Sequence, residues 1–76
     1  MNQTNIQNAK DLMEQGWKAR ENFEFESAEK LLTQARQIFI SEEDWFNVTE
    51  SMNHLAYSYK LQAQQLINSG LEVARN

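Results

Sequence analysis

The chain has 76 residues, a net charge of −4 and no cysteine, so it is long enough for one small domain and has neither disulfides nor thiolate metal sites. Hydrophobic residues make up 41% of it, too many for a disordered tail, and the absence of proline disfavours a turn-rich β fold. The acidic excess argues against a nucleic-acid binder, and no apolar run approaches the roughly 18 residues of a membrane span. We therefore expect residues 1–76 to form a single all-α domain in the cytoplasm.

The first predicted helix covers about residues 5–21. Thr4 and Gln7 have the spacing of a capping box, in which each side chain hydrogen-bonds to the other residue's backbone N–H group. Apolar and small residues then recur at steps of three and four, which is the periodicity of one helix face. Members of this stripe are Ile6, Ala9, Met13, Gly16 and Trp17.

Two further helices are predicted, over about residues 25–40 and about residues 45–69. Asp44 has a side chain suited to cap the third helix. The third helix either continues to Ser69 or breaks into two near Gln62, and Gly70 is a position at which it would fray or bend. The apolar stripes are Phe25, Ala28, Leu31, Leu32, Ala35, Ile38 and Phe39 in the second helix, and Trp45, Val48, Met52, Leu55, Ala56, Tyr59, Ala63, Leu66 and Ile67 in the third.

The arrangement of Gly16, Phe25, Ala28, Leu32 and Ala35 resembles a tetratricopeptide (TPR) repeat. In that family a small residue in the first helix lets the second helix approach closely, and alanines seven residues apart form the contact face of the second helix. The resemblance implies that Gly16 faces Ala28 where the first two helices meet.

A second first-helix signature of the same family is found at Leu55 and Ala56, with Tyr59 three residues later. Ala56 is then equivalent to Gly16, and their separation of forty residues resembles the longer TPR variants. The resemblance covers residues 9–62, about one and a half repeats. It implies a three-helix fold, in which the first two helices form an antiparallel hairpin and the third stacks on it as the next repeat would.

A second family, the MIT (microtubule interacting and transport) domain, is a three-helix bundle of about this length. Residues 59–66 are similar to the end of its third helix. We prefer the TPR resemblance because it explains the stretch from Ile38 to Tyr59 better, although Phe23 stands where TPR repeats usually have a turn glycine.

The sequence contains little that supports catalysis. His54 is the only histidine, and without cysteine or a second histidine it does not complete a metal site or a catalytic set. No glycine-rich phosphate loop is present. We expect no enzymatic activity, no cofactor and no bound metal.

The TPR resemblance implies a concave groove between the first and third helices. Its aromatic and basic side chains suit a peptide with apolar anchors and some negative charge. The alternative for Trp17 and Tyr57 is that they pack against each other in a small core. The expected lining residues are Lys10, Met13, Trp17 and Arg20 from the first helix and Glu50, Asn53, Tyr57 and Lys60 from the third.

Two functions of different kinds follow from this pattern. The first is a protein–protein interaction module that binds a peptide or helix in the groove between the first and third helices. The alternatives are a structural homo-oligomer or homodimer assembled through the second and third helices, and an MIT-like peptide-binding bundle. Stacked repeats normally need three or more units, so one and a half units should leave apolar surface uncovered.

Overall fold

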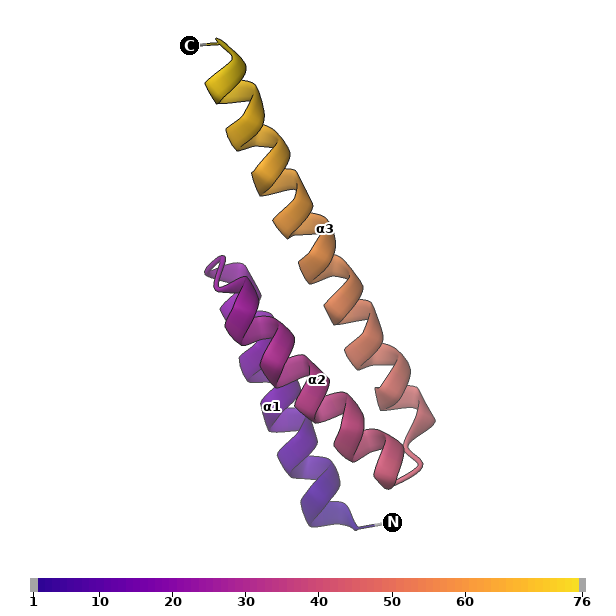
Figure 1. Cartoon of the computed structure of the whole chain (residues 1–76). Helices are drawn as coiled ribbons and strands as arrows, with labels where there is room; N and C mark the ends of the chain where they lie inside the picture. The colour runs from indigo at the N-terminus through magenta and orange to yellow at the C-terminus, as the bar shows by residue number, and fades with distance from the viewer. Residues whose placement is uncertain (1, 76) are drawn as a thin grey trace.

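The computed structural model describes the backbone of residues 2–75 and the side chains as far as residue 70. Within these residues the chain forms three α-helices and no strand: α1 (Gln3–Glu21), α2 (Phe25–Ser41) and α3 (Trp45–Arg75). The helices α1 and α2 form an antiparallel hairpin, and α3 packs mainly on α2 and runs in the same direction as α1 (Figure 1). The prediction of an all-α fold with three helices is confirmed.

The start of α1 differs from the prediction. Asn2 is the N-cap residue, and its side-chain oxygen accepts a hydrogen bond from the backbone N–H of Asn5 at 3.1 Å. Thr4 lies inside the first turn of the helix, so the predicted capping box with Gln7 is wrong.

The N-terminus of α1 is also held by the end of α2. The Glu42 carboxylate accepts hydrogen bonds from the backbone N–H of Asn2 and from the side-chain amide of Asn5, both at 2.8 Å. The hydrogen bond from Asn5, and then that from Asn2, lower the pKa of Glu42 below its usual value. This contact joins residues about forty positions apart, which helical periodicity does not predict.

Both turns between the helices have the same form. The middle residues, Phe23 with φ 61° and Glu43 with φ 56°, lie in the left-handed region that normally favours glycine. In each turn the next residue donates its N–H group to the carbonyl oxygen five positions back, at 2.9 Å, which is the Schellman arrangement. Phe23 therefore occupies a conformation suited to the glycine that TPR turns usually contain.

The third helix is longer than predicted. Asp44 caps it as expected, because its carboxylate accepts the backbone N–H of Asn47 at 3.3 Å. The helix then continues without interruption through Gln62 and Gly70 to Arg75. The prediction of one continuous helix is confirmed, the alternative break near Gln62 does not occur, and the end predicted at Ser69 is too early. As a result, the C-terminal part of α3 extends beyond the α1–α2 hairpin (Figure 1).

The core consists of two clusters along the helix contacts, and Met13 of α1 packs against both. The predicted contact face of α2 is confirmed, because Ala28, Leu32 and Ala35 are fully buried. The first cluster contains Ile6, Ala9, Ala35 and Phe39, and the second contains Ala19, Ala28, Leu32 and Leu55.

The helices α1 and α2 approach each other closely at Gly16. A Cβ atom added there would lie 2.7 Å from Cγ and 2.8 Å from Cδ2 of Leu32, so only glycine fits without a shift. The three atoms nearest to this position all belong to Leu32, one helical turn beyond Ala28, and Leu32 and Ala28 lie in the same core cluster. The side chain that packs most closely on Gly16 is thus that of Leu32 rather than the expected Ala28.

The contact between α2 and α3 also uses small residues. Ser51 is fully buried and Ser58 is 3% exposed, on either side of the buried Leu55. The hydroxyl of Ser51 donates to the carbonyl oxygen of Val48 at 2.8 Å, which satisfies its polar group within α3. These serines let α3 approach α2 closely.

Candidate protein-binding surfaces

The predicted groove residues of α1 and α3 form a surface that we call the α1–α3 face. A buried arginine of this face, Arg20, contacts residues of both helices. Arg20 is 6% exposed, and its guanidinium lies 3.0 Å from Nδ1 of His54 and donates to the Glu21 carboxylate at 3.2 Å. Its Cζ atom lies 4.7 Å from the centre of the Tyr57 ring, which is a cation–π contact. Two of the predicted groove residues, Arg20 and Tyr57, are therefore brought together from different helices.

His54 accepts from Arg20 in its neutral form. Burial, and then the positive charge of Arg20, lower the pKa of His54 below 6.5, although the Glu50 carboxylate opposes this shift. The sequence did not identify His54 as the partner of Arg20. The two residues are 34 positions apart on different helices, and periodicity within each helix does not show which residues meet between helices.

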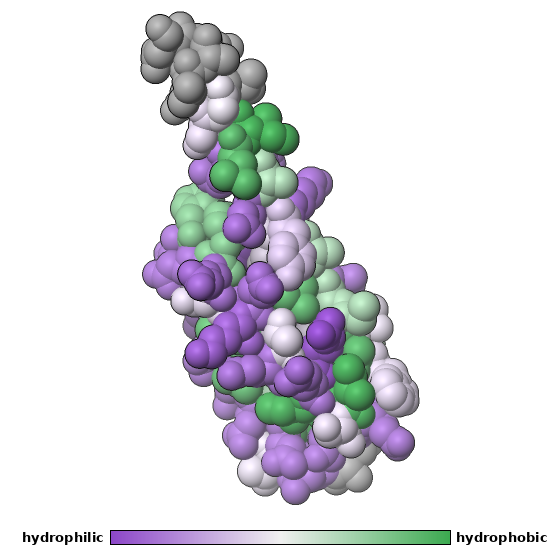
Figure 2. Space-filling view, viewed as in Figure 1, coloured by the Kyte–Doolittle hydropathy of each residue, from purple (hydrophilic) through white to green (hydrophobic). Residues whose placement is uncertain are grey.

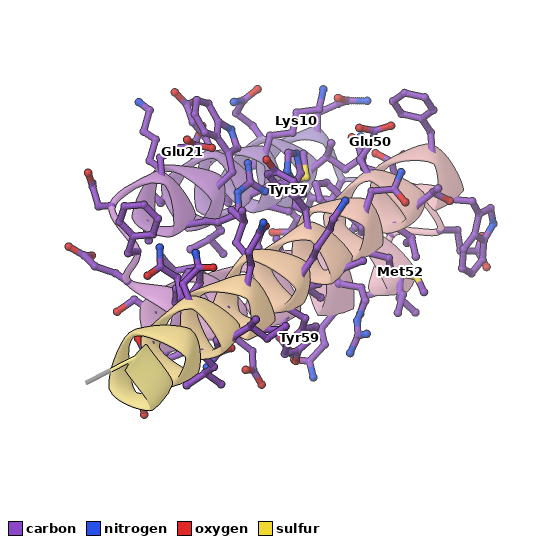
Figure 3. All side chains as sticks on the ribbon, turned by 90° about the horizontal axis from the view of Figure 1, so that it is seen from above. Lys10, Glu21, Glu50, Met52, Tyr57 and Tyr59 are labelled. Carbon is purple, nitrogen blue, oxygen red and sulfur yellow. The ribbon has the colours of Figure 1, made fainter. Side chains whose placement is uncertain are left out.

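The other predicted groove residues differ in exposure. Met13 packs into the core, and Trp17 and Glu50 are half-buried. Trp17 belongs to neither core cluster, and the Lys18 ammonium lies 6.0 Å from its ring. Figure 3 shows Lys10, Glu50 and Tyr57 on the side where α1 and α3 face each other. The exposed members of the set are Lys10, Asn53, Tyr57 and Lys60.

The positive charges on this face thus have different surroundings. Arg20 is surrounded by His54, Tyr57 and Glu21, so its guanidinium is already engaged within the chain. Lys10 and Lys60 are exposed and are the groups able to meet an acidic ligand. Tyr57 is 46% exposed, and its ring, which contacts Arg20, is an apolar surface on the same face.

A second surface is a groove between α2 and α3, which we call the α2–α3 groove. None of its residues was predicted from the sequence to be part of a binding site. Partial desolvation, and then the nearby Glu29 carboxylate, raise the pKa of the Tyr59 hydroxyl in this groove. Figure 3 shows Met52 and Tyr59 on the side of α3 away from Tyr57, so the two surfaces are separate. The groove is lined by Glu29, Thr33 and Arg36 of α2 and by Met52, Leu55, Ala56 and Tyr59 of α3.

The C-terminal part of α3 carries exposed apolar side chains. Leu66 is 69% exposed and Ile67 is 62% exposed. In the space-filling view, hydrophobic surface is visible on the part of α3 that extends past the hairpin (Figure 2). Every residue from 62 to 70 is exposed, so this segment touches little of the described chain.

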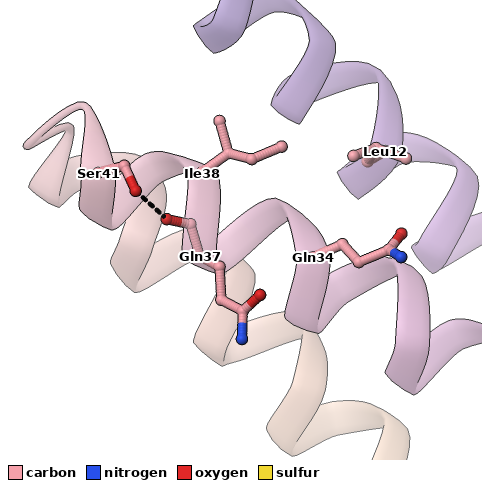
Figure 4. Close-up of a pocket in the computed structure, with 5 residues that line it drawn as sticks. All are labelled: Leu12, Gln34, Gln37, Ile38 and Ser41. Atoms are coloured by element: carbon pink, nitrogen blue, oxygen red, sulfur yellow. Dashed lines mark hydrogen bonds between the residues drawn. The ribbon is translucent and has the colours of Figure 1, made fainter.

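A third depression lies between α1 and α2 (Figure 4). Leu12 and Ile38 form its apolar part, and the Ser41 hydroxyl donates to the carbonyl oxygen of Gln37 at 3.1 Å. Gln34 completes the lining. These residues include no group that titrates near neutral pH, so the depression has no evident acid–base chemistry.

In the described part of the chain, no three His, Cys, Asp or Glu side chains gather closely enough to hold a metal ion. None of the described helices has both the length and the apolar character needed to cross a bilayer. Comparison with protein families, with curated proteins and with solved structures finds no match for this chain.

Proposed function

We propose that this chain is a protein–protein interaction module, TPR-like in its packing, that binds a peptide or a helix along the α1–α3 face. The observation that carries the proposal is the partly exposed Tyr57 ring, held against the buried guanidinium of Arg20. A fixed aromatic ring loses little side-chain entropy when it binds a ligand, which is why such residues often act as anchors in interfaces.

The chemistry of this face defines the ligand. Tyr57 and the half-buried Trp17 offer apolar surface, and the exposed Lys10 and Lys60 offer positive charge. A ligand segment with an apolar side chain flanked by acidic residues complements them. The MIT resemblance leads to the same kind of ligand, a peptide bound between helices.

The proposal is tested by selecting peptides from a random display library and mapping the bound peptide by NMR chemical shifts. We expect shifts at Trp17, Tyr57 and Lys60, and weaker binding by about 2 kcal/mol in Tyr57→Ala. Circular dichroism of this variant is the control for folding. If selected peptides shift only Met52, Ala56 and their neighbours, the α1–α3 face is not the binding site.

A charge variant gives an independent check on the same face. The double substitution Lys10→Glu with Lys60→Glu should weaken binding of an acidic peptide more at low salt than at high salt, because salt screens exposed charges. The matched comparison for net charge is Lys60→Glu against Lys30→Glu on α2, because each single substitution changes the net charge by the same amount. Equal losses in these two single variants would mean that only net charge matters.

A second candidate function is a structural homo-oligomer assembled through α2 and α3. The observation that favours it is the exposed apolar surface of α3, which continues from the α2–α3 groove to Leu66 and Ile67. It uses a different face from the peptide site, so the two functions are compatible.

A further inference from the structure

One face of α3 has a regular heptad pattern along its described length, and we call it the α3 seam. Four large residues recur every seven positions, and four small residues recur every seven positions between them. All eight are exposed, with Trp45 at 60%, Met52 at 50%, Tyr59 at 50% and Leu66 at 69%. The large residues are Trp45, Met52, Tyr59 and Leu66, and the small ones are Thr49, Ala56, Ala63 and Gly70.

Because large and small residues alternate along the seam, two copies of α3 fit each other when they pair in one orientation. When two such helices pair antiparallel, each layer joins the large position of one helix to the small position of the other. When they pair parallel, large residues meet large residues and small meet small, which leaves gaps and clashes in alternate layers. The α3 seam therefore fits an antiparallel second copy of itself.

We propose that two copies of the chain form an antiparallel dimer through the α3 seam, in which residues 62–70 of each copy lie in the α2–α3 groove of the other. In the register that achieves this, Leu66 of one copy lies opposite Ala56 of the second copy. The same register places Tyr59 opposite Ala63 and Met52 opposite Gly70. Six layers then span about 27 Å of helix.

The segment 62–70 has the properties of a piece of helix that a partner covers. Its side chains are all exposed, so packing within the described chain does not stabilise it. A short helix without tertiary contacts is marginal in water. The segment contains no charged residue, although the whole chain has a net charge of −4, so two copies meet there without repulsion between like charges.

The α2–α3 groove matches this segment. Ala56 lines it on α3, and Glu29, Thr33 and Arg36 line it on α2. Ala56 corresponds to Gly16 in the TPR comparison, and Gly16 is the position where α1 receives a covering helix. Each copy supplies one free helix segment and one groove, so the exchange closes with twofold symmetry and leaves neither unfilled.

This inference deepens the second candidate function and is independent of peptide binding on the α1–α3 face. Sedimentation velocity tests it with two matched variants, Leu66→Glu on the seam and Asn68→Glu on the opposite side of the same helix segment. We expect wild type and Asn68→Glu to be dimers at high micromolar concentration and Leu66→Glu to be a monomer. Neither residue contacts the core clusters, and circular dichroism checks that both variants retain the hairpin.

A wild-type chain that stays monomeric into the millimolar range overturns the proposal, even if another ligand binds in the α2–α3 groove. A Leu66→Glu variant that remains a dimer also overturns it, because the contact then lies elsewhere. Neither result affects the peptide site, because that site lies on the α1–α3 face and NMR mapping tests it separately.

The orientation is tested by distances between spin labels, which the absence of cysteine makes straightforward. Single cysteines replace Gln64 or Glu43, and each labelled dimer gives one distance. With a rise of 1.5 Å per residue, the proposed register separates the two copies of residue 64 by about 9 Å along the helix axis and those of residue 43 by about 54 Å. Short distances at both positions indicate a parallel dimer and contradict the proposal.

Discussion

The two helices that run in the same direction, α1 and α3, differ in what covers their small residues. Gly16 of α1 is buried against Leu32 of α2, whereas Ala56 of α3 is exposed and faces the open α2–α3 groove. A small residue on a helix face favours close approach by another helix, and only α1 has that helix within the described chain. Stability should therefore depend on the α1–α2 contact, and association should depend on α3.

The largest expected effect comes from truncating the side chain that covers Gly16. Leu32→Ala should lower the free energy of unfolding by about 2–5 kcal/mol, because Leu32 is fully buried and its removal leaves a cavity. The matched change Leu66→Ala on the exposed part of α3 should alter it by less than about 0.5 kcal/mol in the monomer. Urea unfolding at a concentration where the chain is monomeric measures both, and equal losses would remove the contrast between the helices.

A pair of glycine substitutions sharpens the same contrast. Gly16→Ala should destabilise by about 1–3 kcal/mol, because the new Cβ atom would lie 2.7 Å from Leu32 Cγ. Gly70→Ala should stabilise the helix by about 0.5–1 kcal/mol, because no atom lies within 4 Å of its added Cβ and alanine has the higher helix propensity. Thermal melts of the two variants should shift in opposite directions. A stabilised Gly16→Ala variant would mean that Leu32 moves aside at little cost.

The turns offer a smaller effect. Glu43→Gly should stabilise the chain by about 1 kcal/mol, since glycine adopts a φ of 56° without the steric cost that glutamate has there. Phe23→Gly relieves the same strain but removes the edge contact between Phe23 and Phe25, whose ring centres are 6.1 Å apart. Differential scanning calorimetry should therefore show a higher melting temperature for Glu43→Gly than for Phe23→Gly. The reverse order would indicate that the left-handed turn costs little.

The smallest expected effect is a pH dependence at the α1–α3 face. The pKa of His54 is lowered in the folded chain, so below about pH 6.5 the unfolded chain binds the proton more readily. The contribution of neutral His54 to stability is present above this pH and is lost as the pH falls through the lowered pKa. Below about pH 6.5, His54→Asn should flatten this part of the stability profile, because an amide oxygen accepts from Arg20 without titrating. A profile unchanged by the substitution would assign the dependence to other groups.

Helical periodicity predicted the fold class because steps of three and four residues suffice to define a helix face. The ends of the helices were less predictable, because residues that favour different helix ends lie close together in the sequence. Asn2 and Thr4 are both residues that cap helices well. The cap is Asn2, whose backbone N–H also donates to Glu42 at the end of α2. Gly70 resembles a helix end, yet its backbone stays helical.

The surfaces were predictable only in part. The set of residues expected on the α1–α3 face came from the TPR resemblance. Within it Arg20 does meet Tyr57, whereas Met13 packs against the core. The contact of Arg20 with His54 depends on the angle between two helices, which no local pattern contains. Ser51 and Ser58 look like surface residues in the sequence, although they are buried where α3 meets α2, and this contact creates the α2–α3 groove.

The most direct test of the difference between α1 and α3 is amide hydrogen exchange measured as a function of protein concentration. Amides of α1 around Gly16 should be protected to the same degree at all concentrations, because their covering helix belongs to the same chain. Amides of residues 62–70 should exchange rapidly in dilute solution and become protected as the concentration rises and a second copy covers them. Protection of residues 62–70 that does not change with concentration, whether high or low, would contradict the account.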